Sequence, residues 1–232
     1  MGAVGTTAVT SLPSAMEITS QDQIKQLQQE MGQTGMEAGN PNETPNGKLY
    51  AKTGKAFNIN AFLNSDGATI LSDYSNWNGL VDKPWVQNAI KQLDKGMKPL
   101  SQAVQVSRYV DGDSLGYMVP GMGVDKSNFN TFLGKLESGE ISPKAFQTAL
   151  KDVNYTHKGY TSTTYEKSHG SYGGRDVRLN IVMRQGTPSI VTNNHAEHEI
   201  VAGRNLPYHF TGGYHVDTLP SGKKQLVLDM YV

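Results

Sequence analysis

The hydrophobic pattern of the chain changes its period near residue 150. Before this point, apolar residues recur every three or four positions, as they do on one face of a helix. The pattern predicts helices over residues 82–96, 124–139 and 142–152. Ser142 is a natural N-cap for the third helix, and Pro143 is a natural first residue. After residue 150, apolar and polar residues alternate, which is typical of strands with one buried face.

These alternating segments predict a set of short strands. They are residues 177–183, PSIVT (188–192), EHEIVA (197–202), YHVDT (214–218) and QLVLDMYV (225–232). An earlier strand is predicted over 103–110, and the segment GYTSTT (159–164) is interpreted as another. A chain with helices first and strands later indicates an α+β domain with an antiparallel or mixed sheet.

Residues 1–48 differ in composition from the rest of the chain. They are rich in Gly, Thr, Ser, Gln and Asn, and the segment GNPNETPNG (39–47) consists of turn-forming residues. One short helix is expected in DQIKQLQQEM (22–31), where apolar residues fall at helical spacing. We therefore predict a flexible polar arm over 1–48 and a globular domain over 49–232.

Composition limits the classes of partner and compartment. The 232 residues contain 21 Lys and Arg and 21 Asp and Glu, so the formal charge is zero and no nucleic-acid partner is predicted. No apolar run reaches the roughly 20 residues that span a bilayer, so no membrane partner is predicted. The absence of cysteine excludes disulfides and thiolate metal sites. There is no convincing signal peptide, which leaves cytoplasmic location, delivery by a virion and non-classical secretion open.

An arginine interrupts the apolar face of the strand predicted over 103–110. Val104, Val106, Arg108 and Val110 share this face by alternation. A guanidinium there is costly unless an anion meets it, and it can grip a phosphate or carboxylate in a fixed geometry. The alternative is a structural ion pair or an arginine that extends to water.

Two further segments carry candidate chemistry. In GYTSTT, Ser162 and Thr164 share a face and can hold a neighbouring carboxylate, although such residues are also ordinary in edge strands. In HAEHEIVAG (195–203), strand alternation sends Glu197 and Glu199 to the same side, where like charges repel. The alternative is a solvated edge strand. The nearby histidines do not match H-E-x-x-H, so no metal site is predicted.

The order of these segments resembles a family. SRYVDG around Arg108, then GYTSTT, then AEHEIVAGRNLPYHF (196–210) is similar to the mono-ADP-ribosyltransferases of the R-S-E class. This class includes clostridial binary-toxin enzymes and phage-encoded transferases. The resemblance covers about residues 85–232. It implies N-terminal helices packed on a mixed or antiparallel core of two sheets.

The resemblance also implies site residues, with NAD as substrate and no metal. Glu199 is the expected catalytic glutamate and Ser162 its positioning partner, while Thr163 and Thr164 support the NAD site. Arg108 is expected to hold the pyrophosphate. It is followed by Tyr109 where the family often has Gly, so Arg175 and Arg178 are the substitutes. Nicotinamide is expected to stack on an aromatic ring, with Tyr160, Tyr165 and Tyr172 as candidates.

The first glutamate of the pair suggests the acceptor. In relatives with two glutamates the acceptor is usually a protein arginine, and Glu197 is expected to attract it and help to remove its proton. The loop 187–196 is expected to meet the target protein. The alternatives are an NAD glycohydrolase without a protein acceptor, a retaining glycosidase that uses both carboxylates, and a non-catalytic virion or interaction protein of the same fold.

Overall fold

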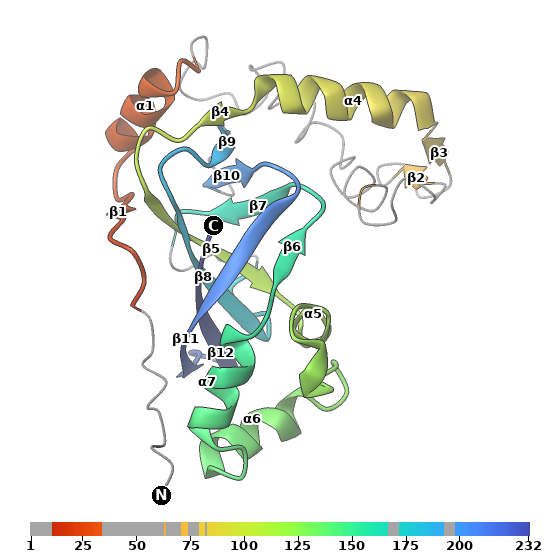
Figure 1. Ribbon diagram of the computed structural model, residues 1–232, viewed down its shortest axis with the longest axis vertical. Helices are drawn as coiled ribbons and strands as arrows, with labels where there is room; N and C mark the ends of the chain where they lie inside the picture. The colour runs from red at the N-terminus through yellow and green to blue at the C-terminus, as the bar shows by residue number, and fades with distance from the viewer. Residues whose placement is uncertain are drawn as a thin grey trace, which may run out of the picture.

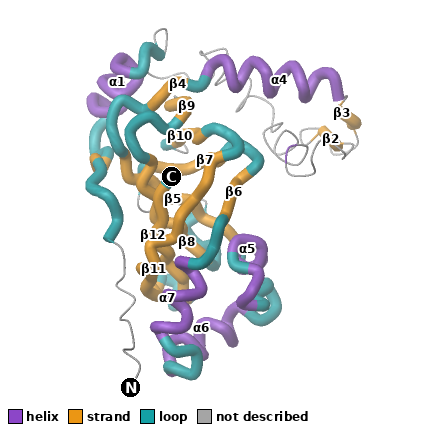
Figure 2. The backbone as a smooth tube through the Cα atoms, viewed as in Figure 1, coloured by secondary structure: helices purple, strands orange, loops and turns teal. Residues whose placement is uncertain are grey.

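The computed structural model describes residues 11–33, 63, 71–73, 79–81, 83–166, 172–192 and 198–232. Within them a mixed β-sheet forms the centre of the molecule, and helices lie around it (Figures 1 and 2). The predicted α+β fold is confirmed. In this part of the chain, no helix is both long and apolar enough to cross a bilayer.

The sheet falls into two halves that meet at one point. Its strands are β1 (Met16–Glu17), β4 (Lys98–Pro99), β5 (Val104–Val110), β6 (Tyr155–His157), β7 (Thr161–Thr164), β8 (Val177–Met183), β9 (Pro188–Val191), β10 (Glu199–Ala202), β11 (Leu206–Thr218) and β12 (Lys224–Tyr231). Their order is β4-β9-β10-β7-β5-β8-β12-β11-β6, with β1 beside β5. β5 pairs with β8 along its whole length but with β7 only through Ser107 and Thr164. The two predicted sheets are therefore the halves of one continuous sheet. A separate hairpin joins β2 (Leu71–Asp73) to β3 (Gly79–Val81).

The predicted helices are present, with one late start. They are α4 (Lys83–Gly96), α6 (Phe129–Ser138) and α7 (Pro143–Lys151). The Ser142 side chain caps α7 by accepting a hydrogen bond from the Ala145 amide at 3.1 Å. α6 begins later than predicted because Asp125 Oδ1 accepts hydrogen bonds from the amides of Ser127 and Asn128, which closes a turn instead of a helix. Two short helices, α5 (Gly112–Met118) and η1 (Pro120–Met122), were not predicted.

One apolar core lies between the sheet and helices α6 and α7. Every second residue of β5 and β8 faces it, including Val106 and Ile181. Phe146 of α7 packs edge-on against Phe132 of α6 and Tyr214 of β11, with ring centroids 5.7 and 4.7 Å away. Burial of these large side chains positions the neighbouring strands, and with them the site.

The helix predicted within the arm is α1 (Gln21–Glu30), capped by Ser20. Its residues Ile24 and Leu27 are buried in the same core as the later elements. Beyond it, the Gln33 side chain accepts a hydrogen bond from the Val191 amide of β9 at 3.1 Å. The division at residue 48 stays a prediction, because residues 34–62 lie outside the described residues.

The strand predicted over 197–202 is shorter in the structure. β10 begins at Glu199, and His198 has a φ of 48°, in the left-handed region. A residue with this backbone conformation breaks the alternation of a strand. The strand alternation that predicts a shared face for Glu197 and Glu199 therefore does not extend through His198, and the shared face stays a prediction. Glu197 itself lies outside the described residues.

Candidate active site

The candidate site lies where the two halves of the sheet part. Within the described strands, no pair other than Ser107–Thr164 joins β5 to β7. Arg108 is the next residue of β5, and alternation places it on the core face, opposite to the face of Ser107. Its guanidinium nevertheless reaches β7, where Nη1 donates a hydrogen bond of 2.8 Å to the Ser162 carbonyl. Arg108 thus bridges the two strands at the point where they separate.

Glu199 is held on the other face of the sheet by two hydroxyl groups. Its side chain is almost fully buried, with 3% of the residue exposed. Ser162 Oγ donates a hydrogen bond of 2.5 Å to Glu199 Oε1. Thr192 Oγ1 lies 3.3 Å from Oε2 and 3.2 Å from the main-chain oxygen of Glu199. These two hydrogen bonds fix the position of the carboxylate in the site.

A small cavity connects three stretches that are far apart in sequence. Its volume is about 210 Å³. It is lined by Ser107, Arg108, Tyr109, Ser162, Thr163, Thr164, Tyr172 and Arg175. The Tyr172 residue is 41% exposed, and the Arg175 guanidinium lies 5.3 Å from the centre of its ring. Arg175 Nη1 also donates to Asp111 Oδ2 at 3.2 Å. The structure therefore brings Arg108, the serine-threonine strand and the loop before β8 together around one cavity.

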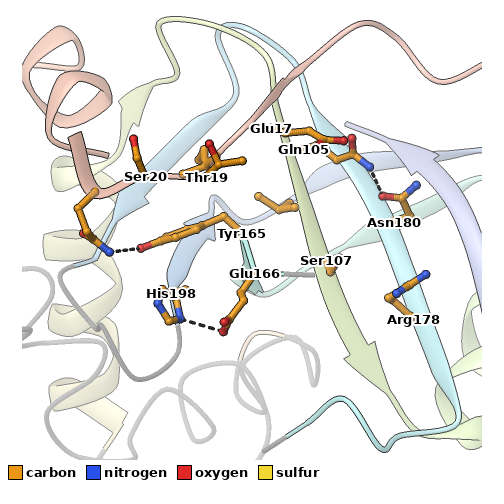
Figure 3. A pocket seen from close by; sticks show the side chains of 13 residues that line it. Glu17, Thr19, Ser20, Gln105, Ser107, Tyr165, Glu166, Arg178, Asn180 and His198 are labelled. Atoms are coloured by element: carbon orange, nitrogen blue, oxygen red, sulfur yellow. Dashed lines mark hydrogen bonds and ion pairs between the residues drawn. The ribbon is translucent and has the colours of Figure 1, made fainter. Parts of the chain in front are cut away.

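A larger cavity of about 640 Å³ adjoins the small one at Ser107, which lines both. Figure 3 shows its walls. The segment Glu17–Gln21 forms one side, and Tyr165, Glu166 and His198 form the other. On the floor, Gln105 Nε2 donates to Asn180 Oδ1 at 2.6 Å.

The wall residues of the larger cavity are ordered by direct contacts. Gln21 Nε2 donates to the Tyr165 hydroxyl at 3.4 Å, which ties the N-terminal segment to the end of β7. His198 Nδ1 lies 3.1 Å from Glu166 Oε2 (Figure 3). From the sequence, His198 stood out only as a possible metal ligand, and nothing pointed to Glu166 or to the segment before α1. No motif marks them, because strand pairing brings them together: β7 with β10 for Glu166 and His198, and β1 with β5 for the segment before α1.

One expected NAD contact lies in the core instead. Tyr160 has no exposed surface, and its hydroxyl donates to Asp94 Oδ1 at 2.6 Å, with the Ile90 carbonyl at 3.2 Å. Burial and the Asp94 carboxylate both raise the pKa of Tyr160. Burial alone would raise the pKa of Asp94, but hydrogen bonds from Arg204 and Tyr160 outweigh it and lower that pKa. The prediction that Tyr160 contacts NAD therefore disagrees with its burial.

The neighbouring threonines have structural hydrogen bonds. Thr163 Oγ1 donates to the Ile200 carbonyl at 2.6 Å, which links β7 to β10. Thr164 Oγ1 accepts from the Glu166 amide at 3.1 Å. Both line the small cavity, so they shape it while they hold the strand in place. The loop tip at Asn193 and Asn194 lies outside the described residues.

Comparison with known proteins identifies the fold and the family. The family model for the ADP-ribosyltransferase exoenzyme matches residues 20–232. The solved structure of C3stau2 from S. aureus with NAD is 16% identical, covers 95% of this chain and 99% of its own, and gives a TM-score of 0.63. The C3 exoenzyme of Clostridium limosum is 17% identical over 94% of this chain and 97% of its own, with a TM-score of 0.59.

Plx2a, an ADP-ribosyltransferase toxin from Paenibacillus larvae, is 16% identical over 91% of this chain and 95% of its own, with a TM-score of 0.58. At these identities the structures show a shared fold. A search of curated proteins gave no match. The family model covers most of the chain, so the chain belongs to the ADP-ribosyltransferase exoenzyme family and is an NAD-dependent mono-ADP-ribosyltransferase, as its R-S-E motifs predicted.

Proposed function

We propose that this enzyme transfers ADP-ribose from NAD to an arginine side chain of a protein. The observation that carries the proposal is the buried carboxylate of Glu199, held by the hydroxyls of Ser162 and Thr192 beside the cavity of Arg108. Such a carboxylate is a fixed negative charge that needs no reorganisation during the reaction.

NAD is proposed to occupy both adjoining cavities. A ligand of drug size fills roughly 300–1,000 Å³, so a dinucleotide exceeds the small cavity of about 210 Å³. The larger cavity supplies the remaining volume through their shared wall at Ser107. In this placement the nicotinamide and its ribose lie near Ser162 and Glu199, and Tyr172 covers the nicotinamide ring.

Two guanidinium groups are proposed to hold the pyrophosphate. Arg108 keeps further N–H donors beside the one that binds the Ser162 carbonyl, and Arg175 lines the same cavity. A guanidinium matches the geometry of phosphate oxygens and stays charged at all relevant pH values. When the pyrophosphate is fixed, the motion of NAD during the reaction is confined to the ribose and the nicotinamide, whose bond breaks.

The proposed chemistry needs no acid to expel the leaving group. The bond between the anomeric carbon and the ring nitrogen breaks, and its electron pair neutralises the cationic nicotinamide ring. The ribose develops oxocarbenium character, which the Glu199 carboxylate stabilises. An acceptor nitrogen then bonds to the anomeric carbon and loses a proton.

Glu197 is proposed to receive that proton from arginine. A guanidinium is protonated at neutral pH and is a poor nucleophile until it loses a proton. A carboxylate two residues before Glu199 in sequence can attract the cation and act as its base. This role rests on the resemblance and on the position of Glu197 in the chain.

The test separates transfer from hydrolysis. We expect Glu197→Gln to reduce transfer from labelled NAD to agmatine, a small guanidine, at least tenfold more than it reduces NAD hydrolysis. Glu137→Gln is the matched control, because Glu137 is a surface residue that pairs with Lys224 at 3.0 Å. An equal loss of both activities would show that Glu197 has no separate role. Release of nicotinamide without any labelled acceptor would indicate an NAD glycohydrolase, and a labelled protein whose ADP-ribose is mapped to a residue other than arginine would exclude arginine.

A further inference from the structure

A third cavity lies on the core face of the sheet, away from Glu199. Its volume is about 520 Å³, and it is enclosed by α5, β6 and the sheet, with α5 beside β6 in Figure 1. Apolar side chains form much of its wall, including Met118, Leu179 and Ile181. Tyr117, which is 83% exposed, also lines it and marks its opening to solvent. The only residue that this cavity shares with the cavities described above is Arg108.

Three buried polar atoms on residues of this cavity make no hydrogen bond within the described part of the chain. They are Thr161 Oγ1, Tyr208 OH and His157 Nε2. Thr161 and Tyr208 are 3% and 2% exposed. An unsatisfied buried polar group costs about 1–3 kcal/mol, and such groups are rare in native proteins. Three of them around one cavity indicate a site that is built to receive hydrogen bonds from, or donate them to, a bound molecule.

The charge of the cavity selects the ligand. Burial, with Arg108 nearby, lowers the pKa of His157 to about 4, although the Tyr160 main chain opposes this. Burial also raises the pKa of Tyr208 to about 12, and the nearby Thr161 hydroxyl opposes this rise. The hydroxyl groups of Tyr208 and Thr161 do not reach hydrogen-bond geometry with each other. Both groups are therefore neutral at pH 7. None of the twelve described residues that line the cavity is acidic, and Arg108 is the charged one.

We propose that this cavity is a second small-molecule site, which binds a planar aromatic carboxylate. The carboxylate meets the Arg108 guanidinium, since a carboxylate and a guanidinium match in charge and geometry. The ring packs against Met118, Leu179 and Ile181. A hydroxyl at the far end of the ring bonds both Thr161 and Tyr208, because a hydroxyl can donate one hydrogen bond and accept another.

Binding of 6-hydroxy-2-naphthoate to the full chain, measured by titration calorimetry without NAD, tests the proposal, and Arg108 is the one lining residue that this cavity shares with the proposed NAD site. We expect Thr161→Val and Tyr208→Phe each to weaken binding about 3–10-fold, the equivalent of one hydrogen bond. The neutral 6-hydroxy-2-naphthamide should bind at least about tenfold more weakly than the acid. Tyr165→Phe, in the larger cavity, is the control and should leave the affinity unchanged. No saturable binding at millimolar probe, or affinities that neither the two variants nor the amide changes, would overturn the proposal.

Thermal unfolding gives a second readout that a structural role for the hydroxyls would change. Thr161→Val should leave Tm unchanged or raise it, because it removes a hydroxyl that has no partner among the described residues. Thr163→Val, two residues away in the same strand, removes a hydroxyl bonded to the Ile200 carbonyl and should lower Tm. An equal fall in Tm for both variants would show that Thr161 has a structural partner, and would overturn the argument for a built site.

Discussion

Replacement of Ser162 by alanine tests how strongly the positioning of Glu199 supports catalysis. Ser162 Oγ donates a hydrogen bond of 2.5 Å to a carboxylate oxygen of a residue that is 3% exposed. A hydrogen bond to a charged group contributes about 1.5–3 kcal/mol. If the bond persists in the transition state, Ser162→Ala should lower kcat/KM about 10- to 150-fold.

The assay is the release of nicotinamide from NAD in the absence of an acceptor. Thr192→Val is the matched comparison, because the Thr192 hydroxyl lies farther from the carboxylate, at 3.3 Å, and is shared with the main-chain oxygen. A weaker contact of this kind contributes about 0.5–1.5 kcal/mol, so the loss should be about 2- to 12-fold. The reasoning is refuted if Ser162→Ala retains wild-type activity, or if Thr192→Val has the larger effect while both variants keep the wild-type Tm.

Two further predictions concern pH and the buried tyrosine. Burial and Arg108 lower the pKa of His157 to about 4, whereas the unfolded chain has the ordinary value near 6.5. The unfolded state therefore binds the proton first as pH falls, and the free energy of unfolding should decrease between pH 6.5 and 4 by at most about 3 kcal/mol. Urea unfolding should show a smaller pH dependence for His157→Gln, and an unchanged dependence would contradict this. Tyr160→Phe removes the bond to Asp94 and should lower the free energy of unfolding by about 1–2 kcal/mol without changing KM for NAD; a raised KM with unchanged stability would restore Tyr160 to the site.

Periodicity predicted the main elements because they lie on one core. β8 has the predicted bounds, Val177–Met183, since every second residue from Val177 to Met183 is apolar and buried. α7 begins after its predicted cap because the Ser142 side chain accepts a hydrogen bond from the Ala145 amide. The failures are local as well: α5 is short, and its sequence, GDSLGYM, contains too few apolar residues to show a helical period. In the same way, the left-handed His198 sets the start of β10 at Glu199, although the alternating pattern of the sequence begins two residues earlier.

The site was only partly predictable, because its geometry depends on which strands pair with each other. The hydrophobic period of the sequence does not show this pairing. The motifs identified Arg108, Ser162 and Glu199, and the structure links them by two hydrogen bonds. It could not be predicted that Arg108 starts on the opposite face from Glu199, since that depends on the single pair that joins β5 to β7. The hydroxyl of Thr192 was missed for a similar reason, because β9 brings it to the carboxylate only through its pairing with β10.

The central claim is that the buried Glu199 carboxylate drives the cleavage of NAD, and one measurement tests it most directly. Glu199→Gln keeps the shape and the hydrogen-bonding capacity of the side chain but removes its charge. The account predicts a fall in the rate of nicotinamide release of at least about 100-fold, the scale seen when a preorganised electrostatic group is removed, with NAD still raising the Tm of the variant. A release rate within about threefold of that of the wild-type enzyme would contradict it.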